Sequence, residues 1–284
     1  MPSIQEIEAL GYYQEVSPLQ QSSTRYPVVR GLASQQTLYA DAVIVENGDY
    51  GRMLFLDHEL QSTSYDEQIY HETLVHPLLH SLGGDGSGGD GKNVLVVGGA
   101  EGATVREVLK WAVRHVDWVD IDGELVKLCR EHLRYTPDSV YDDKRVSYYA
   151  ADIMNFLDNM ERVGLYDAII IDLPDPDPTS HVLYGETFWK LIHRSLKMGG
   201  GIVSHVGPVE PGRRPGLEMV RDGAGGGGHA FHTYVPSFQG EWGFWMNKEP
   251  AFDRPFDLAG CGVVDDAYLR TVFHWGRHWG HSRR

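Results

Sequence analysis

Residues 94–102, Val-Leu-Val-Val-Gly-Gly-Ala-Glu-Gly, together with Asp120 form the pattern with the clearest chemical meaning in this chain. Apolar residues that lead directly into glycines predict a buried strand, and the turn after it lets a ligand approach the backbone. Asp120 lies at the expected end of the next strand, where a carboxylate can accept hydrogen bonds from ribose hydroxyls. The pattern therefore predicts a nucleoside site.

The glycines at positions 98, 99 and 102 enclose an acidic residue, Glu101. Dinucleotide sites use a different spacing, in which one residue separates the first two glycines and two residues precede the third. An acidic side chain beside a helix N-terminus repels a pyrophosphate, so a cationic ligand of the S-adenosylmethionine type fits better than NAD or ATP. The alternative is a tight strand-to-helix turn that binds no ligand.

A second group of acids is expected where the apolar run 168–171 ends in Asp172. Three prolines in residues 173–178 stiffen the loop that follows, which also carries Asp175. We expect both carboxylates at the mouth of the same cleft, where two rigid acids favour a cation between them. Alternatively, they cap a helix or solvate the loop. Asp152, which follows another expected strand, either reads an adenine amino group or caps the next helix.

These residues need a scaffold, and strands alternate with helices between residues 93 and 206. Such alternation predicts a parallel sheet covered by helices on both faces, with ligands bound at the carboxyl ends of the strands. Two later runs, 229–235 and 242–247, predict an antiparallel pair that closes the sheet. The expected strands are 93–98, 116–121, 145–149, 167–172 and 201–206, and the expected helices are 102–115, 123–134, 152–160 and 185–197.

A small antiparallel β unit is predicted ahead of this sheet. Asn47-Gly48-Asp49 between two apolar runs is a strong hairpin signal. Residues 65–80 then predict a helix with a kink or break near Pro77. Residues 83–91, rich in Gly and Asp, indicate a flexible connection rather than a calcium-binding repeat. The expected strands of the β unit are 26–29, 37–45 and 52–56.

Composition is typical of a soluble globular protein: 284 residues, 42% hydrophobic, can form one large domain with a small one. The net charge of -15 argues against a nucleic-acid partner and agrees with a cationic substrate. Two cysteines indicate no disulfide scaffold, and no apolar run indicates a secretion signal or membrane span. We expect a cytoplasmic protein without a metal centre. The aromatic, basic tail from Tyr268 predicts packing against a partner subunit in a homodimer or homotetramer.

Several motifs resemble those of the polyamine aminopropyltransferases, the spermidine and thermospermine synthases, over roughly residues 37–250. Leu-Asp-His-Glu-Leu-Gln-Ser at 56–62 resembles the family's Leu-Asp-Gly-Glu-Leu-Gln-Ser, and Asp-Leu-Pro-Asp-Pro at 172–176 resembles its catalytic Asp-Leu-Ala-Asp-Pro loop. The Phe at position 238 resembles the thermospermine synthases, because the spermidine synthases have Tyr at this position. The other matching segments are 66–72 with His76-Pro77, 98–107, and 235–238 with Trp242-Gly243.

The resemblance implies an α/β fold with a Rossmann-like sheet of the class I methyltransferase type, in a catalytic domain over 65–284 after an N-terminal β domain over 1–64. It implies that decarboxylated S-adenosylmethionine donates an aminopropyl group to a polyamine. Tyr70, Asp172 and Asp175 would handle the acceptor amine. The donor-binding residues would be Gln61, His71, Gly98, Gly99, Glu101, Asp120 and Asp152.

Elementary chemistry agrees with a base at Asp172. An amine of pKa about 10.4 is free base in only about one molecule in 2500 at pH 7, so a carboxylate that accepts its proton removes much of the barrier. Displacement at the carbon next to a sulfonium then needs mainly alignment.

Three departures from the family motifs, Ala40, His58 and Ala100, are expected to reshape the pocket. One alternative is therefore methyl transfer from intact S-adenosylmethionine to an aromatic, indole-type metabolite. Glu101 argues against it, because at about 4 Å and an effective dielectric near 20 it repels the methionine carboxylate by about 4 kcal/mol. A further alternative is a catalytically silent binding protein, against which the retained Tyr70, Asp172 and Asp175 speak.

Overall fold

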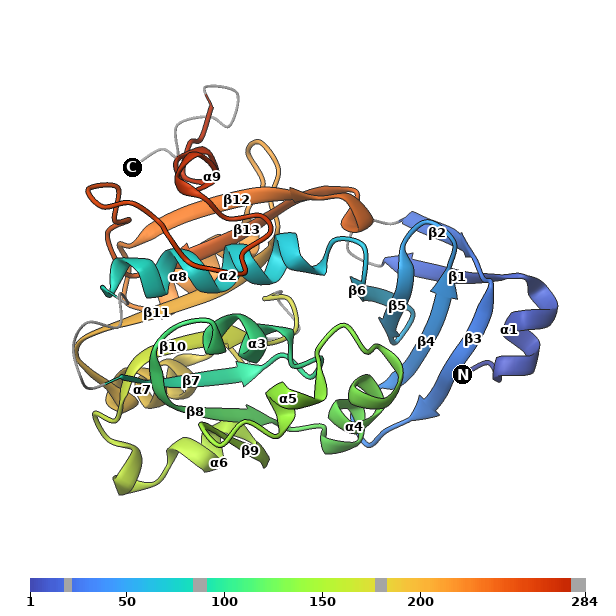
Figure 1. Ribbon diagram of the computed structural model, residues 1–284, viewed down its shortest axis with the longest axis horizontal. Helices are drawn as coiled ribbons and strands as arrows, with labels where there is room; N and C mark the ends of the chain where they lie inside the picture. The colour runs from blue at the N-terminus through green and yellow to red at the C-terminus, as the bar shows by residue number, and fades with distance from the viewer. Residues whose placement is uncertain (18–21, 84–90, 177–182, 277–284) are drawn as a thin grey trace.

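The computed structural model describes residues 1–17, 22–83, 91–176 and 183–276. Its largest element is a seven-stranded sheet in the order β12-β13-β11-β10-β7-β8-β9. The five strands from β11 to β9 are parallel, and β12 and β13 close one edge as an antiparallel pair (Figure 1). The bounds are β7 Lys92–Gly98, β8 Val113–Asp120, β9 Val146–Ala150, β10 Tyr166–Asp172, β11 Leu196–Pro208, β12 His229–Val235 and β13 Gly240–Met246.

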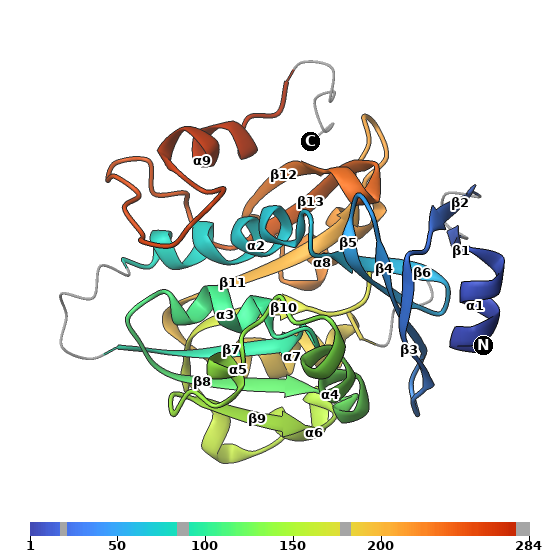
Figure 2. The same ribbon diagram turned by 45° about the vertical axis from the view of Figure 1, so that its right-hand side comes forward.

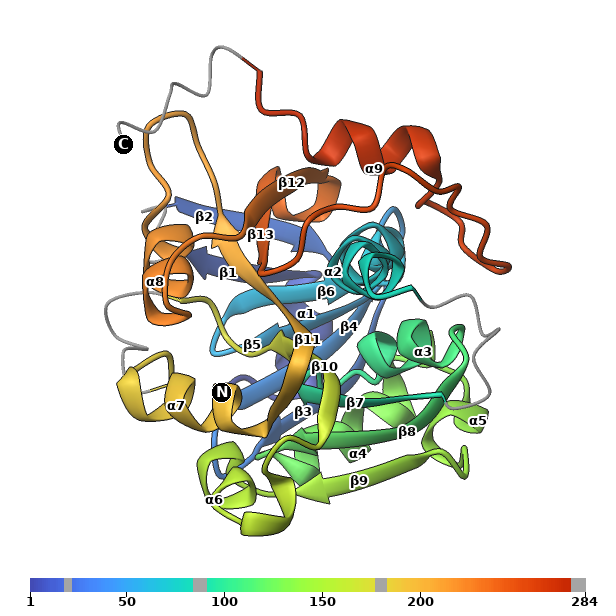
Figure 3. The ribbon, with the colours of Figure 1, turned by 90° about the vertical axis from the view of Figure 1, so that its left-hand side faces the viewer.

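Helices cover both faces of this sheet because its central strands are apolar on both sides. Along β7, Val94 and Val96 belong to one core cluster, whereas Leu95 and Val97 belong to another. Figure 3 shows the two helical layers on either side of the strands. One layer holds α2 Glu67–Ser81, α3 Ala103–Leu109, α4 Gly123–His132, α5 Asp138–Tyr141 and α9 Asp266–Val272, and the other holds α6 Ile153–Leu157, α7 Glu186–Ser195 and α8 Pro215–Gly223. The predicted α/β fold class is confirmed.

The N-terminal segment forms small antiparallel sheets at the end toward which β7 and β8 run (Figures 1 and 2). The predicted hairpin is present: the Asn47 side chain accepts hydrogen bonds from the main-chain N–H groups of Asp49 and Tyr50. A separate aromatic core that includes Tyr13, Tyr26 and Phe55 stabilises this unit. Its elements are α1 Ile4–Leu10, β1 Tyr12–Ser17, β2 Ser22–Pro27, β3 Arg30–Gln36, β4 Asp41–Asn47, β5 Gly51–Leu56 and β6 Glu59–Thr63.

Several predicted boundaries were wrong. The helix expected over 102–115 ends at Leu109, because Val113 already pairs with Lys92 in the sheet and starts β8. The helix expected over 152–160 ends at Leu157 and is followed by a short 3-10 turn, η1 Met160–Arg162. The strand expected over 37–45 begins only at Asp41, and the pattern missed α1, β1, β3, β6, α5, α8 and α9.

Pro77 does not break its helix, since α2 continues to Ser81. A proline removes one helical hydrogen bond, and the packing of this fully buried stretch compensates for the loss. The described start of the tail packs on its own chain: Phe273 and Trp275 contact β12, where Trp275 donates a hydrogen bond to the Ala230 carbonyl over 2.8 Å. Packing of the tail against a partner subunit stays a prediction. Most of the Gly-Asp connection, 84–90, lies outside the described residues, as does the end of the tail.

Candidate active site

A cavity of about 620 Å³ lies at the carboxyl ends of β7, β8 and β10, beside the N-terminal strands. Its position follows from the topology, because loops that leave the carboxyl ends of parallel strands meet at one edge of a sheet. All of the residues predicted for the site line this one cavity. They are Gln61, Tyr70, His71, Gly98, Gly99, Glu101, Asp120, Asp152, Asp172 and Asp175.

The glycine turn after β7 is fixed by its contact with the neighbouring strand β10. Gly98 and Gly99 have φ angles of 81° and 71°, which only glycine adopts without strain. A Cβ atom at Gly98 would lie 2.1 Å from the main-chain oxygen of Asp172, and the N–H of Gly99 donates to that same oxygen over 2.9 Å. The turn that borders the predicted donor therefore also holds the start of the acidic loop in place.

Two carboxylates beside this turn, Glu101 and Asp120, lie in surroundings that favour their neutral forms. Burial, with the nearby charges of Asp122 and Glu101, raises the pKa of Asp120 to about 7, although the N–H of Asp122 donates to it over 2.8 Å. Burial likewise raises the pKa of Glu101, and the charge of Asp172 adds to the effect. A bound cation would relieve this repulsion, so the pair is suited to a positively charged ligand.

Asp152 has the predicted capping role, and its predicted contact with adenine stays a proposal. One carboxylate oxygen caps α6, accepting from the N–H groups of Met154 and Asn155 at 2.8 and 3.0 Å. The same residue borders the cavity. The cap holds the side chain in place at the end of β9, where adenine recognition was predicted.

His71 is tied to two residues that sequence reasoning missed. Its Nδ1 lies 2.9 Å from a carboxylate oxygen of Glu67, which in turn accepts two hydrogen bonds from Arg106, at 2.8 and 2.9 Å. Burial alone would lower the pKa of His71, but the carboxylates of Glu67 and Glu101 outweigh it and raise the pKa to about 9. The i, i+4 spacing of Glu67 and His71 on a predicted helix was the signal that could have found this pair.

Asp172 is oriented by two hydroxyl groups from different elements. Tyr70 on α2 donates to one carboxylate oxygen over 2.8 Å, and Thr104 on α3 donates to the other over 2.5 Å. Burial and the Asp172 charge raise the pKa of Tyr70 well above its usual value, so its hydroxyl stays protonated and keeps donating. Thr104 was not predicted, because nothing local marks its hydroxyl as a partner of β10.

The opposite wall is assembled around Asp66, the residue before α2. Its carboxylate accepts from the hydroxyl of Thr63 and from both the N–H and the hydroxyl of Ser237, at 2.7 to 2.9 Å. These bonds attach η2, Pro236–Phe238, to the start of α2. Phe238 and Trp242 then line the cavity with their ring centroids 4.5 Å apart.

The charge of the lining is one-sided. Among the described residues, nine carboxylates border the cavity and no Lys or Arg does. Two histidines, His71 and His205, are the lining residues that can carry positive charge. The acidic residues are Glu15, Asp57, Glu59, Glu101, Asp120, Asp122, Asp152, Asp172 and Asp175.

Comparison with known proteins agrees with this geometry. The model of the spermine/spermidine synthase domain matches residues 67–251. A polyamine aminopropyltransferase of Synechococcus sp. (strain JA-3-3Ab) is 36% identical over 239 residues, 82% of this chain and 75% of the relative. One from Saccharolobus islandicus (strain L.S.2.15 / Lassen #1) is 38% identical over 222 residues, 75% of this chain and 70% of the relative.

The chain belongs to the spermine/spermidine synthase family. The resemblance seen in the sequence motifs is thereby confirmed. Two solved structures share the fold at low identity. A spermidine synthase in complex with the transition-state analogue AdoDATO has a TM-score of 0.82 at 22% identity, covering 94% of this chain and 92% of its own. The Thermotoga maritima spermidine synthase has a TM-score of 0.80 at 23% identity, covering 94% and 91%.

The departures from the family motifs differ in where they lie. Ala40 and Ala100 border the cavity, as predicted. His58, in contrast, is not among the lining residues: its ring contacts the Tyr13 hydroxyl at 3.1 Å, and its φ of 70° explains why glycine suits this turn. The expectation that His58 reshapes the pocket was therefore wrong.

A second polar cluster, Glu72, His76 and Cys261, brings potential metal ligands within 4.8 Å of one another. Trp111 donates to His76 Nδ1 over 3.1 Å, which leaves the proton of a neutral ring on Nε2. The Glu72 carboxylate accepts from the main-chain N–H groups of residues 262–264. This arrangement fits a set of hydrogen bonds that joins α2 to the C-terminal segment better than it fits a metal centre.

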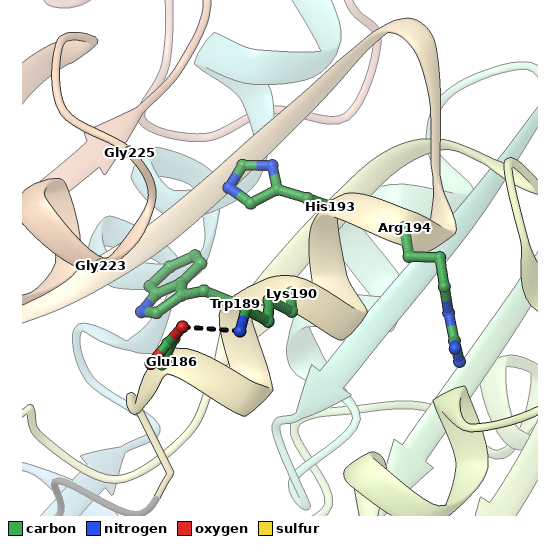
Figure 4. A pocket seen from close by; sticks show the side chains of 7 residues that line it. All are labelled: Glu186, Trp189, Lys190, His193, Arg194, Gly223 and Gly225. Carbon is green, nitrogen blue, oxygen red and sulfur yellow. Dashed lines mark ion pairs between the residues drawn. The ribbon is translucent and has the colours of Figure 1, made fainter.

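A surface hollow of about 500 Å³ lies between α7 and the end of α8, and none of the predicted site residues lines it (Figure 4). Glu186 and Lys190 form an ion pair of 2.6 Å on its rim. None of the helices in the described parts of the chain is long and apolar enough to span a membrane.

Proposed function

We propose that this protein transfers an aminopropyl group from decarboxylated S-adenosylmethionine to an amine of a polyamine. The observation that carries the proposal is the lining of nine carboxylates, with no Lys or Arg among the described lining residues. Both substrates are cationic, and such a cavity attracts them and opposes the carboxylate of intact S-adenosylmethionine. The names of the curated relatives, polyamine aminopropyltransferases, support the same reaction.

The donor half of the mechanism follows from the strand ends. In this proposal, Asp120 accepts hydrogen bonds from the ribose hydroxyls and Asp152 from the adenine amino group. Glu101 faces the charged propylamine tail, together with Gln61 and His71. Gly98 and Gly99 leave room for the nucleoside against the backbone. These contacts bind and align the donor.

The acceptor half depends on Asp172 and Asp175, which hold the substrate ammonium between them. Asp172 accepts a proton from the ammonium, and the freed nitrogen lone pair attacks the carbon next to the sulfonium. The new N–C bond forms as the C–S bond breaks, and its electron pair stays on sulfur. Tyr70 and Thr104 fix the direction of the carboxylate, which satisfies the alignment that displacement needs.

Mass spectrometry of the reaction products tests the proposal. The purified protein is incubated with decarboxylated S-adenosylmethionine and putrescine or spermidine, and in parallel with intact S-adenosylmethionine and tryptamine. We expect an aminopropyl product in the first mixture and no methyl product in the second. The reverse pattern would establish methyl transfer, and no product with failure to bind either donor would favour a silent binding protein.

Location and assembly are part of the same proposal. Cys129 and Cys261 are both free thiols, which agrees with a cytoplasmic protein. A homodimer or homotetramer remains a prediction for solution measurements of mass.

A further inference from the structure

His205 lies on β11, lines the cavity and is only 3% exposed. Its Nε2 contacts the main-chain oxygen of Leu173, in the loop between Asp172 and Asp175. A carbonyl oxygen can only accept, so Nε2 carries the proton of a neutral ring. Nδ1 is therefore unprotonated, and its lone pair is buried at the edge of the acceptor site.

This Nδ1 has no hydrogen-bond partner among the described residues. The carboxylate oxygen of Asp175 lies 3.6 Å away, too far for a hydrogen bond and close enough to approach after a small movement. Buried polar atoms are rarely left without a partner, because the loss of hydration is not compensated. An unpartnered imidazole nitrogen beside a substrate-facing carboxylate points to a role during turnover.

The other hydroxyl groups near His205 already donate hydrogen bonds to other acceptors. On α2, Tyr70, whose ring centroid lies 6.0 Å from that of His205, donates to Asp172. Tyr184 donates to the main-chain oxygen of Pro174 over 2.9 Å. On β13, the residue paired with His205 is the apolar Phe244. Among these described neighbours, the imidazole is the group with a lone pair that no hydrogen bond uses.

Chemistry shows why such a group matters. A carboxylate that has accepted the ammonium's proton cannot act as a base again until it passes that proton on, and the Nδ1 lone pair 3.6 Å from Asp175 is a second acceptor for it.

We propose that His205 acts through Asp175 as the residue that stores the acceptor's proton. This inference rests on the proposed function. Asp172 accepts the proton of the ammonium, the proton moves to Asp175 on the other side of the acceptor nitrogen, and Asp175 passes it to Nδ1, giving an imidazolium beside a carboxylate. The amine then forms the N–C bond, the C–S electron pair goes to sulfur, and the imidazolium later releases its proton to water.

The test is the pH profile of turnover in His205→Gln. Glutamine keeps an N–H donor for the Leu173 oxygen and an acceptor opposite Asp175, but it does not take up a proton. We expect kcat to fall by about 10- to 100-fold near pH 7, with the acceptor KM within about threefold. The deficit should shrink to about twofold near pH 10, where the amine already loses its proton to solvent.

His193→Gln is the matched control. This histidine makes the same kind of contact, Nε2 to the Ala224 carbonyl at 3.2 Å, but lies on α7 at the separate hollow (Figure 4). Its kcat should equal that of the wild type at every pH. If His205→Gln does not fold, the same measurement is made on Asp175→Asn, which interrupts the same proton path. Its kcat deficit relative to the wild type should likewise shrink at high pH.

A kcat deficit of constant size across the pH range, or no deficit, would overturn the inference. In the double variant with Asp175→Asn, a further loss equal to that of His205→Gln alone would show that the two act independently and would also overturn it. A wild-type protein that forms no aminopropyl product overturns the proposed function and this inference together. An active wild type with a constant deficit overturns only the inference.

Discussion

The two ends of the cavity are built in different ways. At the donor end, Gly98, Glu101, Asp120 and Asp152 follow successive parallel strands, and each is placed by its own strand end or helix cap. At the acceptor end, side chains far apart in the sequence orient one another, as the bond between Tyr70 and Asp172 shows. Donor binding should therefore tolerate single changes at the acceptor end, whereas acceptor chemistry should not.

Asp172→Asn should give the largest effect and separate the two ends most clearly. The amide keeps the shape of the side chain but not its ability to take up a proton, so turnover should fall by about 10² to 10⁴. The donor dissociation constant, measured by calorimetry, should stay within severalfold. Asp167→Asn, at the other end of β10 beside Lys197, is the matched control and should keep full turnover. Unchanged turnover in Asp172→Asn would remove this carboxylate from the mechanism.

Asp120→Asn should affect the donor end instead. Hydrogen bonds to a charged group contribute about 1.5 to 3 kcal/mol, so donor affinity at pH 8 should fall by about 10- to 150-fold. Wild-type affinity should also decline below pH 7, because burial raises the pKa of Asp120 to about 7 and its protonated form is a weaker acceptor for the ribose hydroxyls. The variant should lack that part of the decline. Equal affinities at pH 8 would place the nucleoside elsewhere.

The same variant should alter stability in the opposite direction. Between about pH 4 and 7, the folded protein keeps a proton on Asp120 that the unfolded chain has lost, so this group makes wild-type stability fall as pH rises. Asp120→Asn removes that penalty. Its free energy of unfolding in urea should exceed that of the wild type by up to about 4 kcal/mol at pH 8 and match it at pH 4. A variant less stable than the wild type at pH 8 would show that ionised Asp120 does not destabilise the folded protein.

Ala40→Gln should have the smallest effect, at the border of the donor end. Ala40 lies in a turn held by the Thr37 hydroxyl and leaves space beside the expected donor tail. A larger side chain there should increase the preference for the decarboxylated donor by about three- to tenfold. Calorimetric titration with both donors measures the ratio. A decrease in the ratio would mean that the space does not receive the tail.

The same contrast explains what the sequence could predict. The central strands, the glycine turn and Asp120 were predictable, because periodicity and the end of a strand are local properties. Thr104, Asp66 and His205 were not, because each acquires its partner only when distant segments meet in the fold. The missed α1 had a local signal, since Ser3 and Glu6 form a capping box. The boundary predicted between residues 64 and 65 stays a proposal for limited proteolysis to test.

Donor discrimination by the wild-type protein tests the central claim most directly. A cavity bordered by nine carboxylates should bind a donor with a cationic tail and oppose one that adds a carboxylate. Calorimetric titrations at pH 8, in matched low and high salt, compare decarboxylated with intact S-adenosylmethionine. We predict at least about tenfold tighter binding of the decarboxylated donor, with the ratio falling in high salt. Equal or tighter binding of the intact donor would contradict the account.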